Sequence, residues 1–125
     1  MRSRHCPKLP NYQLTHLPNL ASFSNLNTVP IAYLTLELRI EAAHSLKDKR
    51  QVLRSVKDRL RNSFNISVAE IDPTDLWQRA TLGVVSISDS RHYLEGLMHN
   101  VEREAVRLAN NTGAEVVDSF LEYLD

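Results

Sequence analysis

Apolar side chains occupy every second position from Ala32 to Ile40, and mostly polar ones lie between them across residues 31–41. A period of two with a single apolar face is typical of a half-buried strand. Shorter runs rich in β-branched and other apolar residues follow at residues 65–71, 80–88 and 114–121. The pattern therefore predicts four strands.

Two longer segments have helical spacing instead. Across residues 44–64 the apolar positions recur every three or four residues, at Leu46, Leu53, Val56, Leu60 and Phe64. Ser45 is expected to cap this helix, with Asp48 adding negative charge to its first turn. A second helix is expected to begin at Asp89 or Ser90 and to close at Gly113 in a left-handed conformation. Its apolar face would comprise Leu94, Leu97, Met98, Val101, Ala105 and Leu108.

The predicted order is βαββαβ, which is the ferredoxin-like pattern of the α+β class. We expect an antiparallel four-stranded sheet with two helices on one face, which leaves the other face open. A length of 125 residues, 42% of them hydrophobic, suits one domain, placed at residues 29–125. Residues 1–28 hold three prolines, no acidic residue and no apolar periodicity. We interpret them as a disordered or non-native N-terminal extension.

Charge is balanced over the whole chain, with 15 basic and 15 acidic residues, but it is unevenly distributed. Residues 45–61 have a net charge of +5, whereas residues 62–125 have a net charge of −7. The basic residues of the first helix form a stripe beside its apolar one, at Lys47, Arg50, Arg54, Lys57 and Arg61. Such a stripe can contact phosphates, although the sequence pI of about 7.0 is low for a nucleic-acid-binding protein. The alternative is a solvated helix face in which Asp58 pairs with Arg54 or Arg61.

Residues 72–79 are a second candidate. Asp72 and Asp75 can offer oxygen ligands to a divalent cation, but two carboxylates are too few for a calcium loop and turn chemistry explains both. Trp77 either packs under the loop or serves as an interaction residue. Arg79, at the start of a strand, is a further interaction candidate and is expected to pair with Glu37 on the open sheet face.

Other chemistries are disfavoured by the sequence. With one cysteine and three glycines, it has no cysteine metal cluster, no intrachain disulfide and no phosphate-cradling loop. No apolar run reaches the roughly 20 residues that span a bilayer. His44 has no nucleophile and orienting acid beside it in sequence. Residues 79–88 contain no aromatic residue, so base stacking on the sheet is not expected. We therefore predict no enzyme activity, cofactor or metal.

The runs HSLKDKR at residues 44–50 and DLWQRATLG at residues 75–83 resemble those of the YlxP-like bacterial family, domain of unknown function 503. The resemblance covers most of the chain from about residue 29. It implies a ferredoxin-like α+β fold and no established enzymatic activity. Genes of the family often lie beside those for translation initiation and ribosome maturation factors, which implies a ribosome-linked role. Members usually begin at the first strand, unlike this chain.

Our leading hypothesis is a small non-enzymatic cytoplasmic protein that binds ribosomal or other structured RNA through the basic stripe. The alternative is a protein-interaction or self-association module that uses the open sheet face, with the basic helix pairing with the acidic C-terminal part of another copy. An enzyme would require Asp72, Asp75 or His44 to converge in a cleft.

Overall fold

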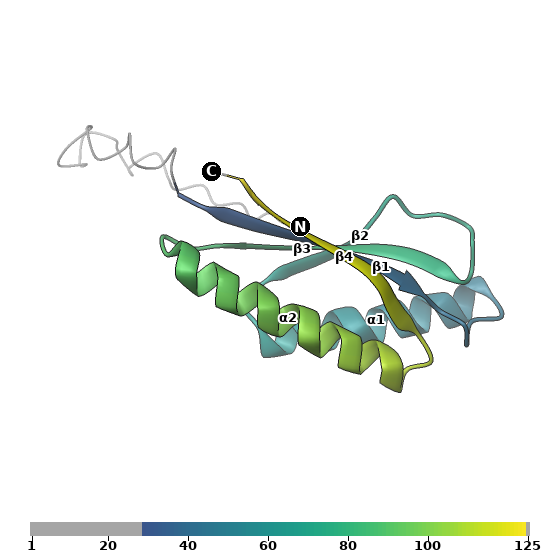
Figure 1. Ribbon diagram of the computed structural model, residues 1–125. Helices are drawn as coiled ribbons and strands as arrows, with labels where there is room; N and C mark the ends of the chain where they lie inside the picture. Colours follow the sequence, from purple (N-terminus) through teal and green to yellow (C-terminus); the bar gives the residue numbers. More distant parts are fainter. Residues whose placement is uncertain (1–28, 125) are drawn as a thin grey trace, which may run out of the picture.

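The computed structural model describes residues 29–124 of the chain, so the predicted extension at residues 1–28 lies outside the described residues. The elements are β1 (Ile31–Arg39), α1 (Leu46–Ser63), β2 (Ser67–Ile71), β3 (Arg79–Ile87), α2 (Arg91–Asn111) and β4 (Glu115–Leu124). Their types and order confirm the predicted βαββαβ pattern (Figure 1).

The four strands form one antiparallel sheet in the order β2-β3-β1-β4. Strands β1 and β3 pair over their full length, from Ile31 opposite Ile87 to Arg39 opposite Arg79. On the other side of β1, the pairing with β4 shifts between Glu37 and Leu38, where β4 contains one extra residue. This arrangement is the ferredoxin-like fold predicted from the sequence.

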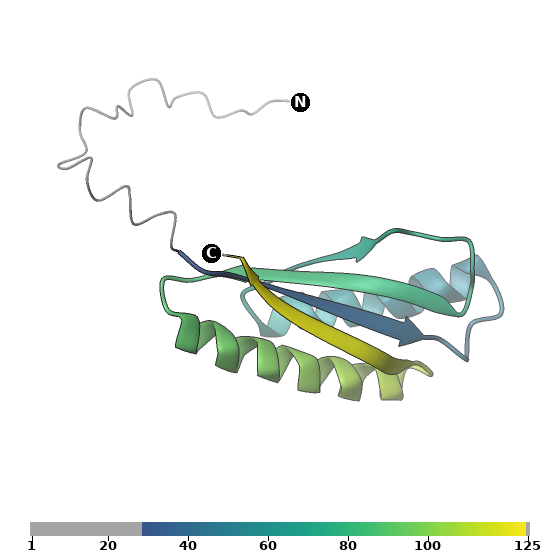
Figure 2. The same ribbon diagram turned by 45° about the horizontal axis from the view of Figure 1, so that its top comes forward.

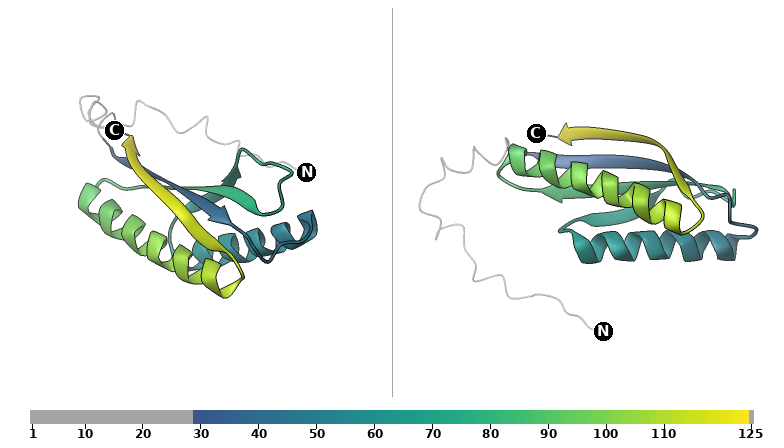
Figure 3. Two further views of the ribbon diagram at one scale, coloured as in Figure 1. Left: turned by 45° about the vertical axis from the view of Figure 1, so that its right-hand side comes forward. Right: turned by 60° about the horizontal axis from the view of Figure 1, so that its bottom comes forward.

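Both helices lie against the same face of the sheet, as the view from the helical side (Figure 3, right) and the view from the sheet side (Figure 2) show. Alternation along β1 directs Leu34, Leu36 and Leu38 toward the helices, where each is at most 2% exposed. From the helices, the fully buried side chains Val56, Leu60, Leu94, Met98 and Val101 complete the core. The opposite face, here called the open face, is covered by no element of the described chain (Figure 3).

Helix ends follow the predicted chemistry. The Ser45 hydroxyl accepts the backbone N–H of Asp48 at 3.1 Å, and the Asp48 carboxylate accepts that of His44 at 3.0 Å. Ser90 caps α2 in the same way. Gly113 closes α2 with a φ of 83°, which confirms the predicted left-handed position.

The strand boundaries differ from the prediction by one to three residues. Strand β1 ends at Arg39 because the chain turns at Glu41 and Ala42, although the N–H of Ile40 still bonds the carbonyl of Gln78, its in-register partner, at 2.9 Å. Strand β4 extends to Leu124, since it pairs with β1 as far as Ile31. Neither helix in the described part of the chain combines the length and apolarity needed to span a membrane.

Candidate nucleic-acid interface

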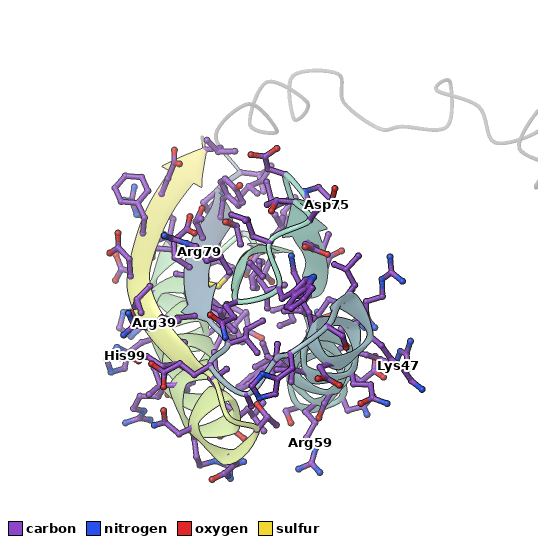
Figure 4. The ribbon with its side chains drawn as sticks, turned by 90° about the vertical axis from the view of Figure 1, so that its right-hand side faces the viewer. Arg39, Lys47, Arg59, Asp75, Arg79 and His99 are labelled. Atoms are coloured by element: carbon purple, nitrogen blue, oxygen red, sulfur yellow. The ribbon has the colours of Figure 1, made fainter. Side chains whose placement is uncertain are left out.

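Helix α1 places its basic residues along one flank. Its buried side chains Leu53, Val56 and Leu60 face the sheet, and the neighbouring helical positions follow the rim of that contact. The predicted stripe lies there: Lys47, Arg50, Arg54 and Arg61 are exposed and Lys57 is half-buried. Figure 4 shows Lys47 projecting from α1 into solvent.

A hollow of about 400 Å³ runs beside this flank, between α1 and the edge strand β2. We call it the basic groove, and its lining residues are Arg50, Leu53, Arg54, Lys57, Asp58, Arg61 and Glu70. The structure thus brings four of the five predicted RNA-binding residues together around one hollow. Lys47, the fifth, lies one turn before Arg50 at the start of the helix.

Both acidic residues of the basic groove are already engaged. The Asp58 carboxylate accepts a bond from Arg61 at 2.6 Å, and the Glu70 carboxylate lies 3.7 Å from the Lys49 ammonium. Among the described residues, Arg50, Arg54 and Lys57 form no ion pair. These three cations therefore remain available to an anion that enters the groove.

Arg59 belongs to a different surface of α1. Figure 4 shows it projecting away from Lys47, on the side of α1 that faces α2. Its charge contributes to the lowered pKa of Glu104 on α2, after the larger effect of the bond that Arg107 donates to the same carboxylate. Arg107 and Arg59 on that side thus interact with the Glu104 carboxylate, whereas Arg50, Arg54 and Lys57 of the basic groove form no ion pair among the described residues.

Sequence reasoning missed the role of Lys49, which counted only toward the basic charge of the helix. Its side chain is 3% exposed, and its Nζ donates to the carbonyl oxygens of Thr74 and Leu76, each at 2.9 Å. A signal existed: Lys49 lies three positions after Leu46 and four before Leu53, on the apolar stripe itself. A lysine at such a position must bury its ammonium among acceptors.

The loop at residues 72–78 joins β2 to β3 and lies over the start of α1. Asp72 has a φ of 53°, which accords with its predicted turn role. Asp75 lines the two hollows beside the loop, whereas neither Asp72 nor His44 is among the residues that line them. In residues 29–124 no group of three or more His, Cys, Asp or Glu side chains is placed to hold a metal ion.

Trp77 does not pack under the loop. The Trp77 side chain is 49% exposed and the adjacent Leu76 is 61% exposed. Both line a hollow of about 390 Å³ together with Asp75, Gln78 and Arg79. Two of the predicted interaction residues, Trp77 and Arg79, therefore share one surface.

The predicted pairing of Arg79 with Glu37 is wrong. In the β1–β3 register, Arg79 lies opposite Arg39, and the Glu37 carboxylate accepts the hydroxyl of Thr81 at 2.8 Å. Arg39 in turn pairs with Glu115 of β4 at 3.0 Å, and this bond raises the pKa of Arg39. The sequence alone does not give the register that decides these pairs.

The open face divides into a polar and an apolar end. The polar end, near the loop, carries Glu37, Arg39 and Thr81 in the pairs just described. At the other end, three adjacent strands present side chains that we call the apolar patch: Ile31, Tyr33, Val85, Ile87, Phe120 and Leu124. Four of them are exposed by 38% to 62%. Glu122 of β4 lies opposite Tyr33 on the same face and adds one carboxylate among them.

Comparisons with known proteins agree with this fold. The uncharacterized protein YlxP of Bacillus subtilis (strain 168) is 39% identical over 71 residues, which are 57% of this chain and 77% of that protein. Among solved structures, the YXEP protein of Bacillus subtilis, a dinuclear metal-binding peptidase of the M20 family, matches with a TM-score of 0.52 and 10% identity. That match covers 77% of this chain but only 26% of the peptidase, so it bears on the fold alone.

A dimeric ferredoxin-like protein of unknown function from Thermobifida fusca matches with a TM-score of 0.44 and 13% identity, over 76% of this chain and 89% of that chain. A family model described as a protein of unknown function, DUF503, matches residues 31–120. This match spans both helices, the first three strands and most of β4, and the YlxP similarity agrees with it. The chain belongs to the YlxP-like DUF503 family.

Proposed function

We propose that this protein is a non-enzymatic, cytoplasmic RNA-binding protein that contacts the phosphates of structured RNA, foremost ribosomal RNA, through the basic groove. The observation that carries the proposal is which charged residues of the groove are paired with each other and which are not. Its two carboxylates are paired, while Arg50, Arg54 and Lys57 have no acidic partner among the described residues. Lysine and arginine side chains in this state are the usual contacts of nucleic-acid phosphates.

The distribution of charge supports a localised contact. The remainder of the domain after the first helix has a net charge of −7, which repels a polyanion everywhere except along α1. Binding is therefore oriented and modest in strength. Because each phosphate contact releases counterions, the affinity should fall steeply as salt rises.

The choice of ribosomal RNA rests on the gene neighbourhood that the family resemblance implies. A double-stranded or folded region fits best, because cations at fixed spacing along a helix flank can contact the two rows of phosphates that border a groove of the RNA. A catalytic role has less support, because Asp72, Asp75 and His44 do not line a common hollow beside the loop.

The test removes three charges from the basic groove with Arg50→Gln, Arg54→Gln and Lys57→Gln in one variant. We expect its affinity for ribosomal RNA to fall at least about tenfold, and the slope of log affinity against log salt to flatten by about three units. Filter binding between about 50 and 200 mM salt gives both quantities. Co-sedimentation with ribosomal particles at the same salt concentrations extends the test to assembled ribosomes.

A matched variant carries Arg59→Gln, Arg103→Gln and Arg107→Gln. It loses the same formal charge from the α1–α2 side, so net charge is held constant between the two variants. We expect its RNA affinity to stay within about threefold of the parent, since these cations lie among acids. Equal losses in both variants would instead mean nonspecific attraction, and an unaffected basic-groove variant would refute the proposal.

The apolar patch favours a second candidate function, self-association through the open face. At the other end of that face, Arg39 pairs with Glu115 and the Glu37 carboxylate accepts the Thr81 hydroxyl, so both of these charges are already engaged within the chain. A copy related by a two-fold axis presents the same apolar surface and is complementary to it. Sedimentation velocity should then show a dimer that Ile87→Ser with Phe120→Ser dissociates; a parent that stays monomeric at high concentration would exclude it.

A further inference from the structure

The loop at residues 72–78 is tied to helix α1 and to Ala43 by hydrogen bonds, although its side chains are exposed. The buried Lys49 ammonium binds two of its carbonyl oxygens, and the N–H of Leu76 donates to the Thr74 hydroxyl at 2.8 Å. At its far end, the Gln78 amide donates to the Ala43 carbonyl at 3.3 Å. The loop is therefore anchored through its middle and at its far end.

The anchored loop exposes two large apolar side chains to solvent. Leu76 and Trp77 are 61% and 49% exposed and line the hollow of about 390 Å³. A volume of that size lies within the range of small-ligand pockets. Large apolar side chains on a fixed support lose little conformational entropy when a flat, apolar group packs against them.

The hollow of about 390 Å³, here called the loop hollow, and the basic groove each share lining residues with a third hollow. This third hollow, of about 140 Å³, shares Asp75 with the loop hollow and shares Arg50, Leu53 and Glu70 with the basic groove. Arg79 borders the loop hollow on its other side. Two carboxylates, those of Asp75 and Glu70, also line this region, and the Glu70 carboxylate lies 3.7 Å from the Lys49 ammonium.

We propose that Trp77 stacks on an unpaired nucleobase of the same RNA whose phosphates occupy the basic groove. This inference rests on the proposed function. A nucleobase is the occupant that fits a flat aromatic surface flanked by arginines, because its ring stacks while its phosphate meets the cations. The RNA recognised is then a folded element with an extruded base or an adjoining single strand, rather than a plain duplex.

Trp77 is the only tryptophan in the chain, so its fluorescence reports on this position directly. The probes are a single-stranded adenine oligoribonucleotide of about ten nucleotides, within the usual site sizes, and a blunt RNA duplex of equal phosphate number. Added to the full chain, the single strand should quench Trp77 fluorescence, and the duplex, whose bases are already stacked, should leave it nearly unchanged.

Substitution separates stacking from charge. Trp77→Ala should weaken binding of the single strand by roughly fivefold to a hundredfold, while Trp77→Phe should lose less. Binding of the duplex should change by no more than about twofold, and the salt slope should stay that of the parent because no phosphate contact is lost. Unfolding midpoints of the variants establish that the fold is intact, as expected for an exposed side chain.

The outcomes distinguish this inference from the proposed function. If Trp77→Ala binds both probes like the parent, or if both probes quench Trp77 equally, stacking is refuted while the basic groove stands. If the parent binds neither probe, nor ribosomal RNA, both proposals fall. Quenching by apolar peptides but not by the single strand would assign the loop hollow to a protein partner and would overturn the inference.

Discussion

The ammonium of Lys49 donates to the carbonyl oxygen of Leu76 at 2.9 Å, although 27 positions separate the two residues in sequence. Thr74 supplies a second carbonyl at the same distance, and Glu70 supplies a carboxylate at 3.7 Å. The Lys49 side chain is only 3% exposed, and a charged group so deeply buried is tolerated only where such acceptors surround it. Helix α1 and the loop that carries Trp77 are thereby joined through one side chain.

Lys49→Met should destabilise the fold by about 1–3 kcal/mol, because two carbonyls lose their hydrogen-bond donor and the Glu70 carboxylate loses its cationic partner. The methionine fills similar space, so the loss reflects the polar contacts rather than a cavity. Urea denaturation measures the difference. Lys47→Met, at an exposed position of the same helix, is the control and should stay within about 0.5 kcal/mol. A Lys49 variant as stable as this control would show that water replaces the ammonium without cost.

The fold could be predicted because each element has its own periodicity. Alternation along β1 is unbroken from Ala32 to Leu38, so only one assignment buries its leucines. The serines that precede both helices and the glycine that follows the second fix where the helices begin and end. These signals are local, and the order of the elements then leaves few topologies.

The candidate site could be predicted only in part, for a physical reason. The basic stripe follows from helical spacing alone, whereas the loop contacts join residues far apart in the chain. The Arg79 prediction failed because cross-strand partners depend on register, which placed Arg39 rather than Glu37 opposite it. The exposure of Trp77 likewise depends on how the loop is anchored. The anchor is Lys49, which the sequence reasoning counted only as part of the basic charge of the helix and which the structure buries.

The strand register predicts the effect of truncating the core. Leu36 is fully buried between the sheet and the helices, so Leu36→Ala should cost about 2–5 kcal/mol. Ile87→Ala removes an aliphatic side chain from the open face, where it is 60% exposed, and should cost less than about 1 kcal/mol. Thermal melts at low protein concentration make the comparison. Similar losses at the two positions would mean that the two sheet faces have been assigned wrongly.

Two glycines predict opposite results for the same substitution. At Gly113 the φ of 83° disfavours any side chain, and a Cβ there would lie 2.5 Å from that of Ala42. Gly113→Ala should therefore destabilise the protein by about 2 kcal/mol or more. At Gly96, inside α2, an added Cβ meets no atom within 4 Å, and Gly96→Ala should stabilise by about 0.5–1 kcal/mol. Melting temperatures that move in the same direction would contradict the helix end described for α2.

Tyr123 predicts a dependence of stability on pH. Its hydroxyl is buried without a hydrogen-bond partner among the described residues, and its ring lies 4.2 Å from the Arg91 guanidinium carbon. Burial raises the pKa of Tyr123, with Glu95 adding to the effect and Arg91 opposing it. The unfolded chain therefore releases this proton first as pH rises. Stability is unaffected below the unfolded pKa of about 10 and is lost from there upward, through the folded pKa.

Tyr123→Phe removes the unpartnered hydroxyl and keeps the ring over Arg91. At pH 7 the variant should equal the parent or exceed it by up to about 1 kcal/mol, because no hydrogen bond is lost. Above about pH 10 its advantage should widen, since the phenylalanine has no proton to release. Denaturation midpoints at neutral and alkaline pH measure this change, with Tyr93→Phe, an exposed position on α2, as the control. A Tyr123 variant whose advantage stays constant with pH would mean that the hydroxyl titrates equally in the folded and unfolded chains.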